Sequence, residues 1–299
     1  MNILLLGKNG QIGRELQRTL LPLGSVTALG RDAFDMEAPN AVAAALRDHS
    51  PDLIVNAAAW TQVDRAETSA DAAFRINADA VGTIAQYARE RGATLLHYST
   101  DYVFDGKKQT PYVETDEANP LNVYGRSKRA GEQALEASGC KFVLLRTSWV
   151  FSAEGTNFIN TILRLARERE NLRIVADQFG APTSAELIAD VTALAVAAHR
   201  RNELAGGIYH LAARGRTSWH ELACYVVKRA RGIGFQLMAD VEDIEPIATE
   251  DYPLPAMRPR NSLLNSNALT RGLGLDLPDW TVHVDRMLQQ LRKRGGRGD

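Results

Sequence analysis

The feature of this chain that most limits its fold is a glycine-rich loop that directly follows an apolar N-terminal run. Residues 2–6 are almost entirely apolar, and Gly7, Gly10 and Gly13 come next in the spacing G-x-x-G-x-x-G, with a helical pattern starting at Gln11. In a strand–loop–helix unit, the first two glycines allow a tight turn and a close backbone approach to a pyrophosphate, and the third lets the helix pack on the strand. The loop therefore predicts a dinucleotide-binding unit, and a purely structural turn is the alternative.

Short apolar runs alternate with helical patterns along much of the chain. The runs occupy residues 3–6, 26–29, 53–55, 94–97, 142–145 and 208–211. The helical patterns occupy residues 11–21, 39–48, 72–91, 123–138 and 186–199. Runs rich in Val, Ile and Leu without polar alternation are typical of strands buried on both faces. With helices between them, they predict an α/β fold with a Rossmann-type, doubly wound parallel sheet.

The regular alternation weakens after about Thr147, and residues 251–260 contain three prolines. We expect a dinucleotide-binding domain over residues 1–150. Residues 151–299 are expected to be mixed, with returning strands and helices of the Rossmann core at about 172–211. These elements would be interleaved with a smaller C-terminal substrate-binding lobe.

Composition and charge argue against several classes of protein. The formal net charge of −1 gives no general attraction to nucleic acid or to an anionic membrane surface. No apolar segment is long enough to span a bilayer, and the chain enters its first strand without a signal peptide, so we expect a cytoplasmic protein. Two cysteines are too few for a disulfide framework, and the six histidines lack zinc-ligand spacing, so these residue types predict no metal site.

The end of the second apolar run should select between the two nicotinamide cofactors. Residues 29–32 read L-G-R-D. An arginine there suits the 2′-phosphate of NADPH, whereas an acidic group suits the free ribose hydroxyl of NADH. Because Arg31 precedes Asp32, NADPH is favoured, and NADH stays open. Asp35 and Met36 follow, where the adenine edge could be contacted.

A tyrosine and a lysine share one face of the predicted helix 123–138. Tyr124 and Lys128 are four residues apart, and the preceding strand ends in Tyr-Ser-Thr-Asp at residues 98–101. Such a pair is often surface packing, but the upstream nucleotide loop favours a redox role. Reduction of a ketone leaves an alkoxide that needs a proton. A neighbouring ammonium would favour the phenolate and bring the tyrosine pKa closer to working pH.

Several stretches of the chain together resemble a known enzyme family. They read GKNGQIG, PDLIVNAAAWTQVDRAE, HYSTDYVFDG, PLNVYGRSK, RTSWVF, DQFGAPT, GIYHL and RPRNSLLN, and they span residues 2 to about 267. The chain resembles the extended short-chain dehydrogenase/reductase superfamily and, within it, the family of dTDP-4-dehydrorhamnose reductases. The resemblance implies reduction of the C4 keto group of dTDP-4-dehydro-β-L-rhamnose to dTDP-β-L-rhamnose. That reaction is the final step of dTDP-rhamnose synthesis for cell-surface polysaccharide such as the O-antigen of lipopolysaccharide.

The resemblance also implies a role for individual residues. Thr100, Tyr124 and Lys128 would form the catalytic triad, with Thr100 in place of the usual serine. The implied cofactor contacts are Gly10, Gln11 and Ile12 at the pyrophosphate, and Ala59, Trp60 and Thr61 at the ribose and phosphates, with Tyr98 nearby. The implied substrate contacts are Thr100, Asp101 and Trp149, with Arg258 and Asn261 at the nucleotide end.

Some relatives in the resembled family dimerise through magnesium held by three glutamates. Two of these are matched here, by Glu15 and Glu186, and the third falls on Gln290. A neutral amide is a weaker ligand for a hard cation, so a metal-bridged dimer is not expected. Glu15 and Glu186 remain weak Mg²⁺ candidates against the alternative of exposed helix charge. A monomer and a homodimer both stay open.

Two alternative functions compete with the reductase. One is another nucleotide-sugar enzyme of the superfamily, such as a reductase, an epimerase or a dehydratase. A dehydratase would use a carboxylate next to the catalytic threonine, which Asp101 supplies, followed by a glutamate, where this chain has Tyr102. The other is a non-enzymatic nucleotide-binding regulatory subunit. The complete Thr100, Tyr124 and Lys128 set favours an enzyme.

Overall fold

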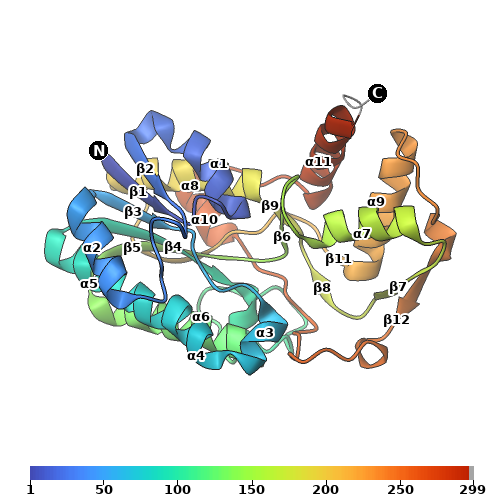
Figure 1. Ribbon diagram of the computed structural model, residues 1–299, viewed down its shortest axis with the longest axis horizontal. Helices are drawn as coiled ribbons and strands as arrows, with labels where there is room; N and C mark the ends of the chain where they lie inside the picture. Colours follow the sequence, from blue (N-terminus) through green and yellow to red (C-terminus); the bar gives the residue numbers. More distant parts are fainter. Residues whose placement is uncertain (296–299) are drawn as a thin grey trace.

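The computed structural model describes residues 1–295, and within them six parallel strands form a twisted central sheet with helices on both faces (Figure 1). The strands, in spatial order, are β10 (Gly207–His210), β5 (Lys141–Thr147), β4 (Thr94–Thr100), β3 (Leu53–Asn56), β1 (Asn2–Leu6) and β2 (Ser25–Leu29). Apolar side chains occupy both faces of the central strands, as a parallel sheet between two helical layers requires. The prediction of a Rossmann-type α/β fold is confirmed.

Two hydrophobic cores flank the sheet. Helices α1 (Gln11–Thr19) and α8 (Ala185–Arg200) cover one face, and α2 (Pro39–His49), α5 (Ala80–Arg91) and α6 (Val123–Ser138) cover the other (Figure 1). Leu16 of α1 and Val191 of α8 belong to the first core, while Ile84 of α5 and Leu135 of α6 belong to the second. The predicted bounds of the helix at 123–138 are confirmed, and those at 11–21, 39–48 and 186–199 shift by one or two residues.

The single helix predicted over residues 72–91 is wrong in one respect. The structure has α4 (Ala70–Phe74), then a π-helical segment at Arg75–Asp79, then α5. The wider turn places the fully buried Asn77 where its amide bonds to the backbone of Trp60 and to Ser127. A Cβ on Gly131 of α6 would collide with the carbonyl oxygen of Asn77. The π turn therefore exists where α6 packs closest to this segment.

A smaller lobe lies beside the carboxyl ends of the strands (Figure 1). Its helices are α7 (Phe158–Glu168), α9 (Trp219–Gly232) and α11 (Trp280–Gly295), whereas α10 (Asn267–Leu273) packs on β10 and α8 of the large sheet. Its paired strands are β6 (Val150–Phe151) with β9 (Thr183–Ser184), β7 (Leu172–Val175) with β12 (Ile244–Ile247), and β8 (Phe179–Gly180) with β11 (Thr217–Ser218). Within residues 172–211, α8 and β10 lie with the large sheet, whereas β7 pairs with β12 in the lobe.

None of the helices between residues 1 and 295 combines the length and apolar character that a membrane crossing needs.

Candidate active site

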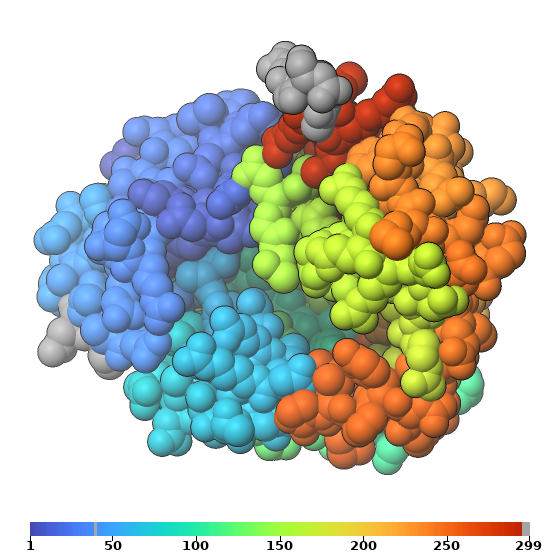
Figure 2. Space-filling view, turned by 45° about the vertical axis from the view of Figure 1, so that its right-hand side comes forward, coloured from blue at the N-terminus to red at the C-terminus, as the bar shows by residue number. Residues whose placement is uncertain are grey.

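The carboxyl ends of the strands face a hollow between the N-terminal part of the chain, in blue, and the lobe, in yellow-green and orange (Figure 2). Ligands of open α/β sheets bind at this edge, where the loops that follow the strands converge. The glycine loop after β1, the loop after β3, the end of β4 and the turn after β5 all open onto it.

The glycine loop has a backbone that side chains would not tolerate. Gly7 has a φ of +87°, and a Cβ there would lie 2.7 Å from the backbone nitrogen of Ala58. A Cβ on Gly13 would collide with the carbonyl oxygen of Gly7. Gly10 precedes α1 with an extended backbone, and no side chain among the described residues caps the helix. The first N–H groups of α1, including that of Ile12, are thus available to a pyrophosphate.

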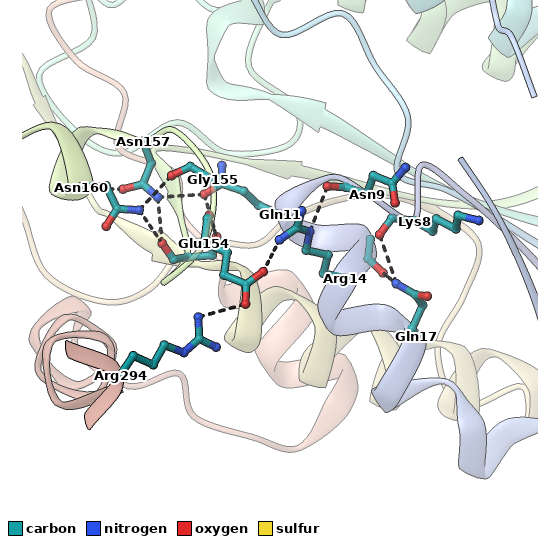
Figure 3. A network of polar contacts seen from close by, with 12 residues as sticks. Lys8, Asn9, Gln11, Arg14, Gln17, Glu154, Gly155, Asn157, Asn160 and Arg294 are labelled. Carbon is teal, nitrogen blue, oxygen red and sulfur yellow. Dashed lines mark hydrogen bonds and ion pairs between the residues drawn. The ribbon is translucent and has the colours of Figure 1, made fainter. Parts of the chain in front are cut away.

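The side chain of Gln11 joins the glycine loop to the lobe (Figure 3). Its Oε1 accepts hydrogen bonds from Ser152 Oγ at 3.0 Å and from Asn157 Nδ2 at 3.1 Å. One turn later, Arg14 forms an ion pair with Glu154 of the same lobe segment. The side-chain amide of Gln11 is therefore hydrogen-bonded to the lobe. The backbone N–H of Gln11 is the group of this residue that can face a ligand.

The loop after β2 carries exposed charges. The Arg31 guanidinium, 77% exposed, donates to Glu37 at 2.8 Å, and Lys8 Nζ lies 3.9 Å from Asp32. Asp35 is exposed, but its carboxylate accepts from the backbone N–H of Glu37.

Met36 follows as a core residue, only 6% exposed, in the cluster that also holds Leu6 and Phe34. The adenine contact predicted for Met36 is therefore limited to the small part of its surface that remains accessible.

The loop after β3 is held by a residue that sequence reasoning missed. Asn77 accepts from the backbone N–H of Trp60 at 2.9 Å and donates to its carbonyl oxygen at 3.0 Å. It also donates to Ser127 Oγ on α6 at 2.9 Å. Asn77 thus fixes the Ala59–Trp60–Thr61 backbone relative to the helix that carries the catalytic candidates. At helical spacing, Asn77 shares a face with Ala73, Ala80 and Val81, and a polar amide among these apolar positions was the available signal.

Tyr124 and Thr100 meet at the carboxyl end of β4. Asn122 caps α6 by accepting from the Gly125 N–H at 2.8 Å, and a Cβ on Gly125 would collide with the carbonyl oxygen of Tyr102. This close packing places Tyr124 beside Thr100. Burial raises the pKa of Tyr124 to about 12, and the nearby Thr100 side chain opposes the rise. The tyrosine is therefore a neutral acid at physiological pH.

Lys128 lies one turn after Tyr124 and is 2% exposed. Its ammonium donates to the carbonyl oxygen of Tyr98 at 2.6 Å and lies 3.3 Å from Nε2 of His97. Burial lowers the pKa of Lys128 to about 8, and the charge of Glu132 opposes this shift. The expectation that Lys128 lowers the tyrosine pKa is wrong for this state of the site, because burial dominates the pKa of Tyr124 and the ammonium bonds to Tyr98 instead.

The side chain of Tyr98 lies away from the triad. Its hydroxyl is hydrogen-bonded to Thr192 Oγ1 of α8 at 2.7 Å, and its ring lies in the core on that face of the sheet. Tyr98 contributes to the site through its backbone carbonyl oxygen, which accepts a hydrogen bond from Lys128.

Asp101 is a buried carboxylate directly after Thr100. It is 2% exposed, and its Oδ1 accepts from the Thr100 hydroxyl at 3.0 Å. Its Oδ2 has no hydrogen-bond partner among the described residues. Burial raises the pKa of Asp101 to about 6, and the nearby Ser262 and Thr100 side chains oppose the rise. The carboxylate therefore orients the Thr100 hydroxyl and keeps its second oxygen buried without a hydrogen-bond partner among the described residues.

The two residues predicted at the nucleotide end are engaged with protein. Arg258 forms a two-pronged ion pair with Asp64, with N–O distances of 3.1 and 2.7 Å. The Asn261 amide donates to the carbonyl oxygens of Lys108 and Thr110, and accepts from the N–H of Leu263. Asn261 thus fastens loops together through all of its polar atoms. Arg258 instead joins the lobe to α3 (Val63–Thr68), a partner that sequence reasoning missed.

The magnesium candidates lie together at the junction of α1, α8 and α11. Glu186 accepts from Gln290 Nε2 at 2.7 Å and from Arg286 Nε at 2.6 Å, so both of its oxygens are engaged. Burial and the charge of Glu186 raise the pKa of Glu15. Within residues 1–295, no three His, Cys, Asp or Glu side chains form a metal-binding group. Arg286 supplies the positive charge at this position.

Comparisons with known proteins agree along almost the whole chain. A family model described as the RmlD substrate binding domain matches residues 1–293. A dTDP-4-dehydrorhamnose reductase of Burkholderia thailandensis is 48% identical over 295 residues, covering 97% of this chain and 99% of the relative.

Two solved structures of similar proteins were also found. A dTDP-4-dehydrorhamnose reductase of Bacillus anthracis, in complex with NADP, aligns with a TM-score of 0.86 and 32% identity over 96% of this chain and 98% of that one. A reductase of the same name from Clostridium acetobutylicum aligns with a TM-score of 0.88 and 32% identity, over 98% of this chain and 100% of that one.

Proposed function

This chain belongs to the RmlD family, whose matched members are dTDP-4-dehydrorhamnose reductases, and we propose that it reduces the C4 keto group of dTDP-4-dehydro-β-L-rhamnose with hydride from NADPH. The product would be dTDP-β-L-rhamnose, the activated sugar for cell-surface polysaccharide. The observation that carries the proposal is the buried Tyr124 beside Thr100 at the end of β4, next to a glycine loop whose backbone leaves no room for side chains. We propose that residues 1–150 hold most of the cofactor site and that the lobe within 151–299 covers the sugar nucleotide.

The residues of the site divide the proton chemistry between them. A bound nicotinamide cofactor supplies the hydride. Thr100, whose hydroxyl donates to Asp101 Oδ1 in the free protein, would turn that proton toward the carbonyl oxygen of the substrate, and Tyr124, kept neutral by burial, donates its proton to the oxygen as negative charge develops there. The ammonium of Lys128, which donates to the Tyr98 carbonyl oxygen in the free protein, would stabilise the phenolate that this transfer leaves by turning toward Tyr124 once the ligands are bound. Until the substrate binds, Asp101 holds the Thr100 hydroxyl in place through its Oδ1.

The direct test supplies the purified protein with dTDP-4-dehydrorhamnose, generated in situ by an upstream epimerase, and follows the absorbance of NADPH and NADH in separate reactions. We expect one cofactor oxidised for each sugar reduced. An epimerase would instead keep and recycle its cofactor, so turnover without net oxidation would support that alternative. No oxidation with either cofactor would refute the proposal.

We propose that Lys8 and Arg31 give the protein a preference for NADPH. Both are cations beside the loop where the adenosine ribose of such cofactors binds. Arg31→Ala should raise the KM for NADPH roughly fivefold, equivalent to about 1 kcal/mol for an exposed ion pair, and leave the KM for NADH within about twofold. Glu37→Gln should lower the KM for NADPH, because Glu37 competes for Arg31 in the free protein.

The matched control for this pair is Arg47→Ala, which removes an exposed arginine near the end of α2. Steady-state kinetics with both cofactors measures all three variants. Equal changes in the KM for NADPH and the KM for NADH in Arg31→Ala would show that Arg31 does not bind the 2′-phosphate.

A further inference from the structure

Trp149 has a backbone conformation that tryptophan rarely adopts. It lies between β5 and β6 with a φ of +48°, in the left-handed region. Residues with a side chain stay there only when surrounding contacts hold them. The carbonyl oxygen of Trp149 accepts from the Thr183 N–H at 3.2 Å, and the Ser148 hydroxyl donates to the carbonyl oxygen of Ala181 at 3.3 Å. The turn is thus fastened to the segment around β9.

The indole of Trp149 lies flat on that of Trp219. The ring centroids are 3.4 Å apart, and the planes differ by 9°. Trp219 is itself held, because its Nε1 donates to Gln178 Oε1 at 3.2 Å and Phe158 packs against it with a centroid distance of 4.5 Å. Trp149 as a whole is half-buried.

Gly180 makes room for this stack. A Cβ at that position would lie 2.5 Å from Cε2 of the Trp149 indole, closer than real Cβ atoms approach a neighbour. Gly180 ends β8 and pairs with Thr217 of β11. Trp219 follows β11 directly, at the start of α9, where Ser218 and Glu221 form a capping box. The strand pair β8–β11 therefore positions both Gly180, which leaves space for the Trp149 indole, and Trp219, which stacks on it.

The stack lies next to the triad in the sheet register. Thr100, the last residue of β4, pairs with Thr147, the last residue of β5, and Trp149 follows two residues later. A rigid indole at this point can contact a sugar whose carbonyl oxygen is held at Thr100.

We propose that Trp219 is a positioning residue, which together with the space at Gly180 holds the indole of Trp149 against the deoxysugar of the substrate. This inference rests on the proposed reductase function. It adds a role for two lobe residues that do not themselves belong to the triad. The stack keeps the Trp149 turn ordered in the free protein. Binding of the sugar therefore does not have to bear the entropic cost of ordering that turn.

Kinetics of Trp219→Ala test the positioning role. We expect the KM for the sugar nucleotide to rise about tenfold, because one ordered contact is lost, while kcat at saturation and the KM for NADPH stay within about twofold. Trp219→Phe keeps a flat ring against Trp149 and should recover most of the lost affinity. Tyr252→Ala, which removes an exposed lobe aromatic, is the matched control. An unchanged KM in Trp219→Ala would overturn the proposal.

Circular dichroism tests the stack without relying on activity. Two indoles at this distance couple excitonically, and a rotation between their transition dipoles within the stack gives a couplet in the ultraviolet spectrum. Trp149→Phe and Trp219→Phe should each abolish the couplet, Gly180→Ala should weaken it by displacing Trp149, and Trp60→Phe should leave it unchanged. A couplet that survives either of the first two changes would overturn the proposal. A wild-type protein with the couplet but no NADPH oxidation would refute the proposed function and the sugar contact, while keeping the role of Trp219 toward Trp149.

Discussion

Replacing Tyr124 with phenylalanine is expected to lower kcat by a factor on the order of 10² or more, while the dissociation constant of NADPH stays within about twofold. The variant loses the phenolic proton and keeps the ring, which packs edge-on to Tyr102 with centroids 5.6 Å apart. Burial keeps Tyr124 protonated, so its hydroxyl is the donor that the developing alkoxide needs. Single-turnover NADPH oxidation and a fluorescence titration of the cofactor separate the two effects.

Tyr209→Phe is the control for this experiment. Its hydroxyl donates to the carbonyl oxygen of Ala205 on the edge strand β10, away from the triad, so its loss should not change turnover. Turnover near the wild-type rate in Tyr124→Phe would show that the proton comes from another group, and Asp101 would be the next candidate because its pKa is raised to about 6.

Replacing Glu132 with alanine should reduce the free energy of unfolding by about 3–5 kcal/mol, because it leaves a buried arginine without its counter-ion. Glu132 on α6 and Arg146 on β5 form a two-pronged pair with N–O distances of 2.8 and 2.7 Å, and their side chains are 0% and 3% exposed. Urea unfolding followed by circular dichroism measures the change.

Two further variants identify the cause of that loss. The double change Glu132→Met and Arg146→Met removes both charges and should recover most of the stability. Glu136→Ala breaks a more exposed contact with Arg129 on the same helix and should cost less than about 1 kcal/mol. A loss in Glu132→Ala no larger than that of Glu136→Ala would show that the buried pair contributes little.

The sheet and the core of the site could be predicted because their signals are local. The glycine spacing, the apolar runs and the four-residue step from Tyr124 to Lys128 each depend on neighbours in the sequence. The helix at 123–138 has the predicted bounds, since Asn122 caps its start and Gly139 follows its end in a left-handed conformation.

The missed features depend on contacts between distant segments. Arg258 pairs with Asp64 across 194 positions, and nothing near either residue indicates the other. The lobe strands β6, β8, β9 and β11 are two residues long, too short to show any periodicity. The pKa of Tyr124 depends on how deeply packing buries it, which the spacing to Lys128 does not reveal. These features depend on packing between segments that are distant in the sequence, so local sequence patterns do not predict them.

The place of β10 at the edge of the sheet determines the order in which the protein can assemble as it leaves the ribosome. The first five strands are contiguous in space, and β10 adds to them at the outer side of β5. The glycine loop and Tyr124 can therefore reach their positions while the second half of the chain is still being translated. The lobe must wait, because β7 and β8 need partners from residues 217–247. A nascent chain would be able to hold a dinucleotide before it can hold a sugar nucleotide.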